Sequence, residues 1–277
     1  MALITVDFIS EKLMRTVTVK VILPTDKLVM PGMPKREPKP FKTLYLLHGI
    51  FGNYTDWVSG TGIQRIAEEN DLAVVMPCGE NRFYVDQPSA HTFYGEFIGI
   101  ELVEQMRKMF PLSHKREDTY IAGLSMGGYG AIRNGLKYSD TFSRIAGFSS
   151  ALIIEELPER TNDAPFFMVR RDYSESVFGD LDKVLESDMN PKWLARKLVE
   201  EGKELPEFYL ACGTKDSFMG VNEDLRDYLK GLGYKVEFDT EDYGHEWTFW
   251  GDEVAKIMKW LPLEGNAAGI NSGNIGI

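Results

Sequence analysis

The residue best suited to nucleophilic chemistry is Ser125, which stands at the centre of the pentapeptide G-L-S-M-G at residues 123–127. The residues before it, D-T-Y-I-A at 118–122, have the composition of a short strand, and residues 128–137 predict the start of a helix. A G-x-S-x-G sequence at a strand-to-helix turn is a nucleophile elbow, which exposes the serine oxygen on a sharp bend. Small residues must flank the serine because the backbone crowds there. We therefore predict that Ser125 is a catalytic nucleophile rather than a serine of a glycine-rich loop.

A serine of this kind needs a general base, and His245 is the one candidate. In enzymes built on such an elbow, the partners follow in the order serine, acid, histidine. The chain has four histidines, and only His245 comes after the elbow. It lies in the polar sequence E-D-Y-G-H-E-W at 241–247, between a strand-like segment and a C-terminal helix. A loop at that place can present an imidazole to the serine.

The acid that orients the histidine is predicted to be Asp216. It follows the strand-like residues 206–213, at the carboxyl end of a strand, where open α/β sheets gather their site residues. Asp239 and Asp242 are less favoured because they are too close in sequence to His245 to meet it easily from a separate strand end. Asp188 is less favoured because it lies in an irregular region. Asp242 is the alternative that the sequence leaves open.

Two backbone N–H groups are needed to stabilise the developing oxyanion. One is expected from Met126, directly after the nucleophile. The other is expected from Ile50, in the loop H-G-I-F-G at 48–52 that follows a buried strand. We interpret His48 as structural, with its imidazole bonding the loop backbone beneath this oxyanion hole.

Composition narrows the class of protein. The chain has 277 residues and a net charge of −11. This negative charge disfavours nucleic acid and anionic membrane surfaces as partners. Its N-terminus has no basic start, which predicts no signal peptide and a cytoplasmic enzyme, and no apolar run approaches a membrane span. Cys78 and Cys212 lie beside apolar segments and are interpreted as packing residues, so we expect no metal, disulfide or cofactor. A homo-oligomer is left open.

The remaining elements predict an α/β fold with a mostly parallel sheet and helices on both faces. Segments 3–9 and 14–23 predict an antiparallel hairpin at one sheet edge. The further strands and helices that we expect alternate along the chain, with strands at 44–47, 73–76, 120–122, 145–148, 208–211 and 236–238, and helices at 63–70, 97–109, 128–137, 221–232 and 253–260.

One long segment interrupts this alternation. Residues 150–205 contain no clean strand but several prolines and aromatic residues, and so long a connection is usually functional. We expect a single domain over residues 1–264, with this segment as a small cap insertion whose residues partly line the pocket. Residues 265–277 form a low-complexity tail, which we expect to be peripheral.

Four motifs together resemble the esterase D/antigen 85 branch of the α/β-hydrolases. They are L-L-H-G-I-F-G-N at 46–53 with D-W at 56–57, P-C-G-E-N-R-F-Y-V-D at 77–86, G-L-S-M-G-G-Y-G-A at 123–131, and G-H-E-W at 244–247. Within this branch the chain is most similar to bacterial tributyrin esterases. The resemblance implies an α/β-hydrolase fold and a carboxylesterase of short acyl chains. It also implies that Ser125, Asp216 and His245 form a triad, with Ile50 and Met126 as oxyanion donors.

The substrate is less well defined than the chemistry. We expect a small-molecule ester, cleaved best as acetyl to butyryl esters. Candidates for the pocket are Phe51, Trp57, Tyr84 and Trp247, with Trp57 as the expected floor. S-formylglutathione hydrolysis, carbohydrate acetyl or feruloyl ester hydrolysis, and acyl transfer all use the same residues. The complete set of catalytic groups disfavours a non-catalytic binding module and, with the resemblance, a peptidase.

Overall fold

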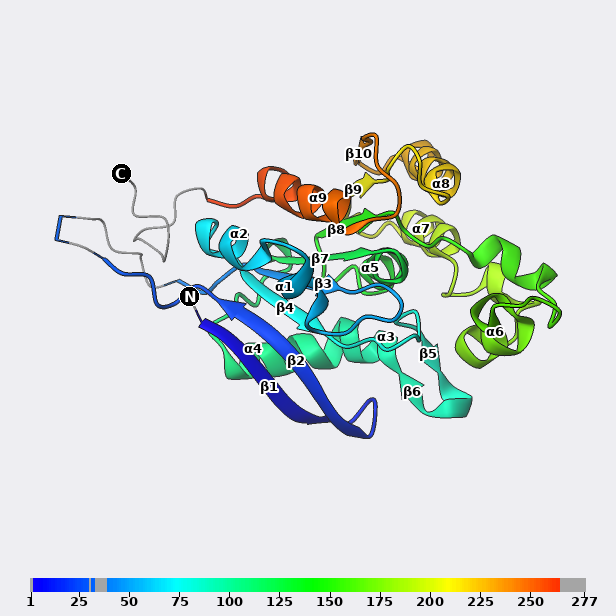
Figure 1. Ribbon diagram of the computed structural model, residues 1–277, viewed down its shortest axis with the longest axis horizontal. Coiled ribbons are helices and arrows are strands. Elements are labelled where there is room, and N and C mark those ends of the chain that lie inside the picture. The colour runs from blue at the N-terminus through cyan, green and yellow to red at the C-terminus, as the bar shows by residue number, and fades with distance from the viewer. Residues whose placement is uncertain (1, 30, 33–38, 265–277) are drawn as a thin grey trace.

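The computed structural model describes residues 2–29, 31–32 and 39–264. The predicted tail at 265–277 lies outside the described residues. Within the described part, an eight-stranded sheet has the order β1-β2-β4-β3-β7-β8-β9-β10 (Figure 1). Its strands are β1 (Ala2–Ser10), β2 (Arg15–Leu23), β3 (Thr43–Leu47), β4 (Ala73–Pro77), β7 (Thr119–Leu124), β8 (Arg144–Phe148), β9 (Glu207–Ala211) and β10 (Val236–Asp239).

Most of this sheet is parallel, as the sequence predicted. Strands β4, β3, β7, β8, β9 and β10 pair in parallel, whereas β1 and β2 form an antiparallel hairpin that joins the sheet through β2 and β4. In the edge strand β1, exposed residues alternate with half-buried ones. The inner strands β3, β4 and β7 are instead buried throughout. Buried runs are what a parallel sheet covered on both faces requires.

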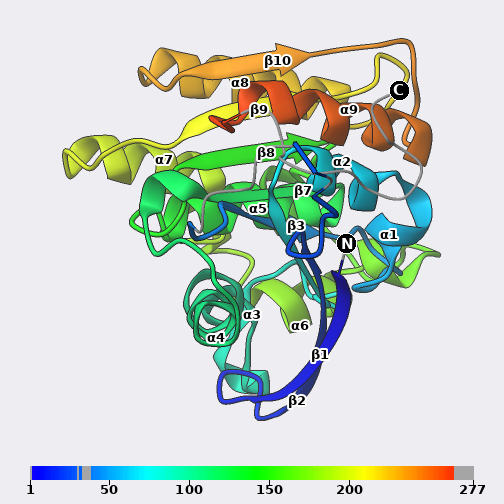
Figure 2. The same ribbon diagram turned by 90° about the vertical axis from the view of Figure 1, so that its left-hand side faces the viewer.

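Helices cover both faces of the sheet and divide the core into two layers (Figure 2). One face carries α4 (Leu102–Met109), α5 (Met126–Lys137), α7 (Pro191–Glu200) and α8 (Met219–Gly231); the other carries α1 (Asp56–Gly60), α2 (Ile63–Glu69) and α9 (Trp247–Trp260). None of the described helices is long and apolar enough to cross a membrane. The α/β-hydrolase architecture expected from the sequence is therefore confirmed.

The remaining described elements are short. They are α3 (Tyr94–Glu96), continued by a π-helical turn (Phe97–Glu101) into α4, α6 (Arg171–Phe178), and a two-stranded sheet of β5 (Asp86–Gln87) and β6 (Thr92–Phe93). Single 3-10 turns occur at Pro88–Ala90, Arg116–Asp118, Ile154–Glu159, Phe167–Val169 and Val184–Glu186. The segment 150–205 contains α6, α7 and three of these turns, and connects β8 to β9.

Candidate active site

Ser125 sits on the sharp bend that its sequence predicts. It follows the last residue of β7, precedes the first residue of α5, and has φ 53° and ψ −118°. A Cβ on Gly123 would lie 2.2 Å from the Gly127 oxygen, and one on Gly127 would lie 2.5 Å from the carbonyl oxygens of Leu47 and His48. These contacts are with backbone, which cannot move aside. The two glycines therefore let the elbow fit against β3 and hold the serine in a strained conformation.

His245 and Asp216 are brought together by the two loops that follow β10 and β9. The His245 Nδ1 and Asp216 Oδ2 atoms are 2.8 Å apart. The Asp216 side chain is fully buried, and its Oδ1 accepts a hydrogen bond of 2.9 Å from the Phe218 backbone N–H. Burial alone raises the pKa of Asp216, but hydrogen bonds from His245, Phe218 and Ser149 outweigh it and hold that pKa below its usual value. An ionised Asp216 accepts a hydrogen bond from the Nδ1–H group of His245, which leaves Nε2 of His245 free to act as a base.

The alternative acids have other partners. Asp242 is exposed and pairs with Lys215 at 2.9 Å. Asp188 pairs with Arg133 and Lys137, and Asp239 pairs with Lys256. Among the acidic residues that are candidates from the sequence, Asp216 is the one whose carboxylate is hydrogen-bonded to His245.

His48 makes the backbone contacts expected of a structural residue. Its Nε2 accepts a hydrogen bond of 2.9 Å from the Gly79 N–H, and its Nδ1 lies 2.6 Å from the Gly49 carbonyl oxygen. These partners require a neutral ring with the proton on Nδ1. Burial lowers the pKa of His48, which favours the same neutral form.

The predicted oxyanion donors belong to the first turn of α5 and to the loop after β3. Met126 is the first residue of α5, and the first N–H groups of a helix have no partner within the helix. The positive end of the helix dipole adds to the attraction for an anion at this place. Ile50 follows β3 and lines the same cavity as Ser125. Next to it, Phe51 has φ 66°, and its N–H donates to Asn81 Oδ1 at 2.8 Å, which fixes the turn of the loop.

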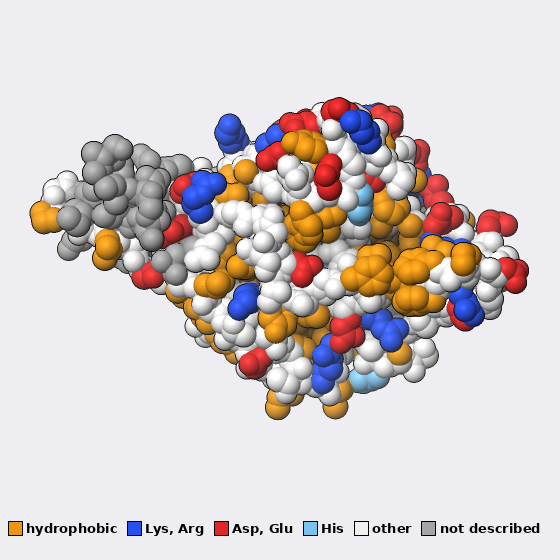
Figure 3. All heavy atoms as spheres, viewed as in Figure 1, with side chains coloured by type: hydrophobic (Ala, Val, Ile, Leu, Met, Phe, Trp, Pro, Cys, Tyr) orange, Lys and Arg blue, Asp and Glu red, His pale blue; other side chains and the backbone are white. Residues whose placement is uncertain are grey.

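A cavity of about 720 Å³ opens at Ser125 and His245. Its walls are mainly apolar, and the segment 150–205 supplies part of them. The lining residues are Gly49, Ile50, Phe51, Asp56, Phe83, Leu124, Ser125, Ala151, Ile153, Arg160, Phe166, Met168, Val169, Phe218, His245, Glu246, Trp247 and Trp250. Phe51 and Phe166 contact each other edge to face and are partly exposed. Hydrophobic side chains gather on this face beside α6 (Figure 3).

Two predicted pocket residues, Trp57 and Tyr84, are in the core instead. Trp57 is 1% exposed and donates from Nε1 to the Leu47 carbonyl oxygen at 3.0 Å. Tyr84 is fully buried and donates from its hydroxyl to the His48 carbonyl oxygen at 3.0 Å. Both rings therefore bond the backbone at the end of β3 and at the start of the loop that carries the predicted oxyanion donor Ile50. The prediction was wrong because a position near the site in the sequence does not determine whether a ring turns toward the cavity or the core.

Two residues that line the cavity were not predicted from the sequence. Phe218 and Trp250 line the cavity and contact His245 edge to face, with ring centroids 5.5 and 4.8 Å away. Each is a close sequence neighbour of a predicted catalytic residue, which is the signal that could have identified them. The predicted Trp247 does line the cavity and packs between Trp57 and Trp250.

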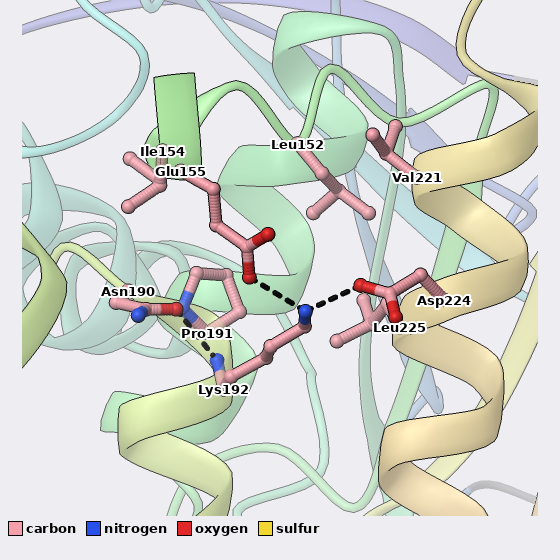
Figure 4. A pocket seen from close by; sticks show the side chains of 9 residues that line it. All are labelled: Leu152, Ile154, Glu155, Asn190, Pro191, Lys192, Val221, Asp224 and Leu225. Carbon is pink, nitrogen blue, oxygen red and sulfur yellow. Dashed lines mark hydrogen bonds and ion pairs between the residues drawn. The ribbon is translucent and has the colours of Figure 1, made fainter. Parts of the chain in front are cut away.

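Two further polar clusters lie away from Ser125. Among the described residues, the carboxylates of Asp239, Glu241 and Glu253 lie within 4.8 Å of one another, and Lys256 Nζ bonds all three. The ammonium group thus supplies the positive charge that these carboxylates need. A cavity of about 30 Å³, room for about one water molecule, lies where Lys192 bridges Glu155 and Asp224 (Figure 4). This bridge ties α7 and α8 to the segment after β8.

Comparisons with known proteins agree on one family. The model of a family described as putative esterase matches residues 10–261. An acetyl esterase of Caldicellulosiruptor saccharolyticus is 40% identical over 261 residues, which cover 94% of this chain and 98% of that protein. Two solved structures from Staphylococcus aureus are 30% identical, and each match covers 94% of this chain and 98% of the other. They are the fluorophosphonate-binding serine hydrolase FphF, with a TM-score of 0.81, and the S-formylglutathione hydrolase FrmB, with a TM-score of 0.79.

Proposed function

This chain belongs to the putative esterase family, and we propose that it is a serine carboxylesterase that hydrolyses small-molecule esters of short acyl chains. The single observation that carries the proposal is the hydrogen bond between Asp216 and His245, a histidine that lines the same cavity as Ser125. Within the family we assign the chain to the esterase D/antigen 85 branch, close to tributyrin esterases, on the strength of the four sequence motifs.

The reaction begins with attack by Ser125 Oγ on the ester carbonyl carbon. His245 Nε2 accepts the serine proton, while Asp216 stabilises the imidazolium that forms. The carbonyl oxygen becomes negative and accepts hydrogen bonds from the N–H groups of Met126 and Ile50. Collapse of the tetrahedral intermediate transfers the proton from His245 to the leaving alcohol and leaves an acyl-enzyme. Water, deprotonated by His245, then releases the acid in the same way.

The acyl group is proposed to be short because the acetyl esterase relative is 40% identical across nearly the whole chain. Cavity volume does not decide this point: about 720 Å³ exceeds the space that a butyryl chain fills. The S-formylglutathione hydrolase relative supports a second candidate substrate, a thioester of a small acyl group.

A panel of p-nitrophenyl esters from acetyl to palmitoyl, run beside S-formylglutathione and acetylated xylan, tests the proposal. We expect kcat/KM to be greatest between acetyl and butyryl and to fall steeply by octanoyl. Equal or higher rates on decanoyl and palmitoyl esters would rule out the short-chain preference. A dominant rate on S-formylglutathione would select the second candidate, and ester products formed with an added alcohol would indicate acyl transfer.

The role of Ser125 is tested by Ser125→Ala. The change removes one oxygen and little packing, so the protein should fold as before. We expect kcat to fall by about 10⁴- to 10⁶-fold, since only oxyanion stabilisation and binding remain. Circular dichroism and thermal unfolding serve as the control for folding. A variant that retains more than about a tenth of the activity would contradict the assignment.

A further inference from the structure

Ser149 occupies a strained and fully buried position beside the proposed triad. It follows the last residue of β8 and has φ 46°, in the left-handed region that side chains other than glycine rarely adopt. Its N–H donates to the Ala211 carbonyl oxygen at 2.7 Å, which holds it against the end of β9. Backbone strain of this kind persists only where the surroundings enforce it. The strain places the Ser149 side chain next to the loop that carries Asp216.

The hydroxyl of Ser149 connects Trp250 to Asp216. The Trp250 Nε1–H donates to Ser149 Oγ at 3.2 Å. A hydrogen bond from the Ser149 side chain is among the causes that hold the pKa of Asp216 below its usual value. An indole N–H can only donate and an ionised carboxylate can only accept, so the directions of both hydrogen bonds are determined. The Cys212 thiol also contacts this hydroxyl, but burial raises the pKa of Cys212 to about 12, and a protonated sulfur is the weaker acceptor.

Asp216 thus has three donors, and each comes from a different part of the fold. His245 follows β10, Phe218 immediately precedes α8, and Ser149 follows β8. Trp250, on the first turn of α9, bonds Ser149 and also presents its ring edge-on to His245, with centroids 4.8 Å apart. Donors besides the histidine restrict how the Asp216 carboxylate can turn relative to His245.

We propose that Ser149 is a positioning residue of the active site: its hydroxyl orients the Asp216 carboxylate toward His245, and Trp250 in turn orients the hydroxyl. The inference rests on the proposed function, because the orientation of His245 limits turnover only if His245 is the base. Ser149 is not among the residues that line the cavity at Ser125, so in this proposal it acts through Asp216 and His245.

Ser149→Ala and Ser149→Gly both remove the hydroxyl, and the glycine variant also relieves the strain, so comparing the two separates loss of the hydroxyl from relief of strain. Thermal unfolding checks that each variant folds. We expect either change to lower kcat by about 10- to 100-fold with KM changed less than about twofold, because a small misplacement of a catalytic group acts on the chemical step. In proton NMR, the far-downfield signal of the hydrogen between His245 and Asp216 should shift or broaden. That signal is read without substrate, so it separates failure of this inference from failure of the proposed esterase activity.

Trp250→Phe keeps a ring against His245 and removes only the indole N–H. We expect a smaller loss of kcat than in Ser149→Ala, and no further loss in the double variant, because the indole acts through the serine. The matched control is Ser150→Ala: Ser150 is the next residue, is equally buried, and has a hydroxyl without a partner. Its kcat and downfield signal should match the wild type. Wild-type kcat and an unchanged signal in both Ser149 variants, a change confined to KM, or an equal loss in Ser150→Ala would each overturn the proposal.

Discussion

Two serines of this protein adopt a backbone conformation that residues other than glycine rarely adopt. Ser125 and Ser149 both have positive φ, and they follow neighbouring strands, β7 and β8. Each conformation costs of the order of 1–3 kcal/mol and aims a hydroxyl that a relaxed serine would not present there. In the function that we propose, the strain at Ser125 serves exposure to substrate, and that at Ser149 serves contact with Asp216.

The choice between the two candidate acids is tested at this scale. Asp216→Asn should lower kcat by about 10⁴-fold because the amide favours the wrong histidine tautomer. Asp242→Asn is the matched control and should change kcat little, since Asp242 is exposed and pairs with Lys215. Steady-state kinetics with an acetyl ester measures both. If the ranks of the two variants were reversed, Asp242 rather than Asp216 would be the acid.

Trp57 is expected to affect stability rather than substrate choice. Its buried ring packs against Phe148 and Trp247 and bonds the Leu47 carbonyl oxygen. Trp57→Ala should therefore lower the free energy of unfolding by about 3–5 kcal/mol, as measured by urea denaturation. The preferred acyl length should stay the same. A stable variant that prefers longer acyl chains would restore Trp57 to the pocket floor.

At the scale of elements, the loops after β9 and β10 are built as one unit. The N–H groups of Thr214 and Lys215 donate to the carbonyl oxygens of Glu241 and Tyr243, at 2.9 and 3.0 Å. A Cβ on Gly213 would lie 2.2 Å from the Tyr243 oxygen. The separation between Asp216 and His245 is thus determined by backbone contacts between the loops as well as by the hydrogen bond itself.

Gly213→Ala should push these loops apart. The methyl group would meet backbone rather than a flexible side chain, so we expect kcat to fall by about 100-fold, measured with an acetyl ester. Gly220→Ala in α8 is the control: no atom lies within 4 Å of its added Cβ, and alanine in a helix should stabilise by up to about 1 kcal/mol. Unchanged kcat in Gly213→Ala would mean that the loops can move without disturbing the site.

Over the whole molecule, a charge network joins the segment 150–205 to α5 and to β5 of the two-stranded sheet. Arg133 and Lys137, both on α5, pair with Asp188 at 2.7 and 2.6 Å, and Lys137 also pairs with Asp86 at 3.0 Å. Arg133 is fully buried, so its charge needs these partners. Burial alone raises the pKa of Asp188, but the two cations outweigh it and hold that pKa below its usual value.

Stability should therefore depend on pH through Asp188. A carboxyl group whose pKa is lowered on folding adds stability above its unfolded pKa of about 3.9 and loses it as pH falls through the folded value. Asp188→Asn should be less stable at pH 7 by about 1–3 kcal/mol, a range that allows for partial solvent screening. This difference from the wild type should shrink below about pH 4.

Urea denaturation, repeated at intervals of about one pH unit between pH 3 and pH 7, measures this dependence. Asp140→Asn is the control, since Asp140 is exposed and pairs loosely with Lys203 at 3.6 Å. It should change stability by less than about 0.5 kcal/mol. A deficit in Asp188→Asn that stays constant down to pH 3 would contradict the role given to the carboxylate.

The sequence by itself determined the features that depend on neighbours along the chain. The elbow, the strand and helix order and the place of Ser125, Asp216 and His245 at strand ends all follow from local patterns and chain order. A local signal was also available for α7, which begins with Asn190 as N-cap and Pro191 in its first turn, although the prolines and aromatic residues around it hid the helix.

Only the tertiary structure decided which side chains meet across the sheet. It joined Asp216 to His245 through the packing of two loops, and turned Trp57 and Tyr84 into the core while Phe218 and Trp250 entered the cavity. It also brought Ser149 beside Asp216, 67 residues later in the chain. These choices depend on strand order, loop approach and ring orientation, and residues distant in sequence carry no local pattern that specifies them.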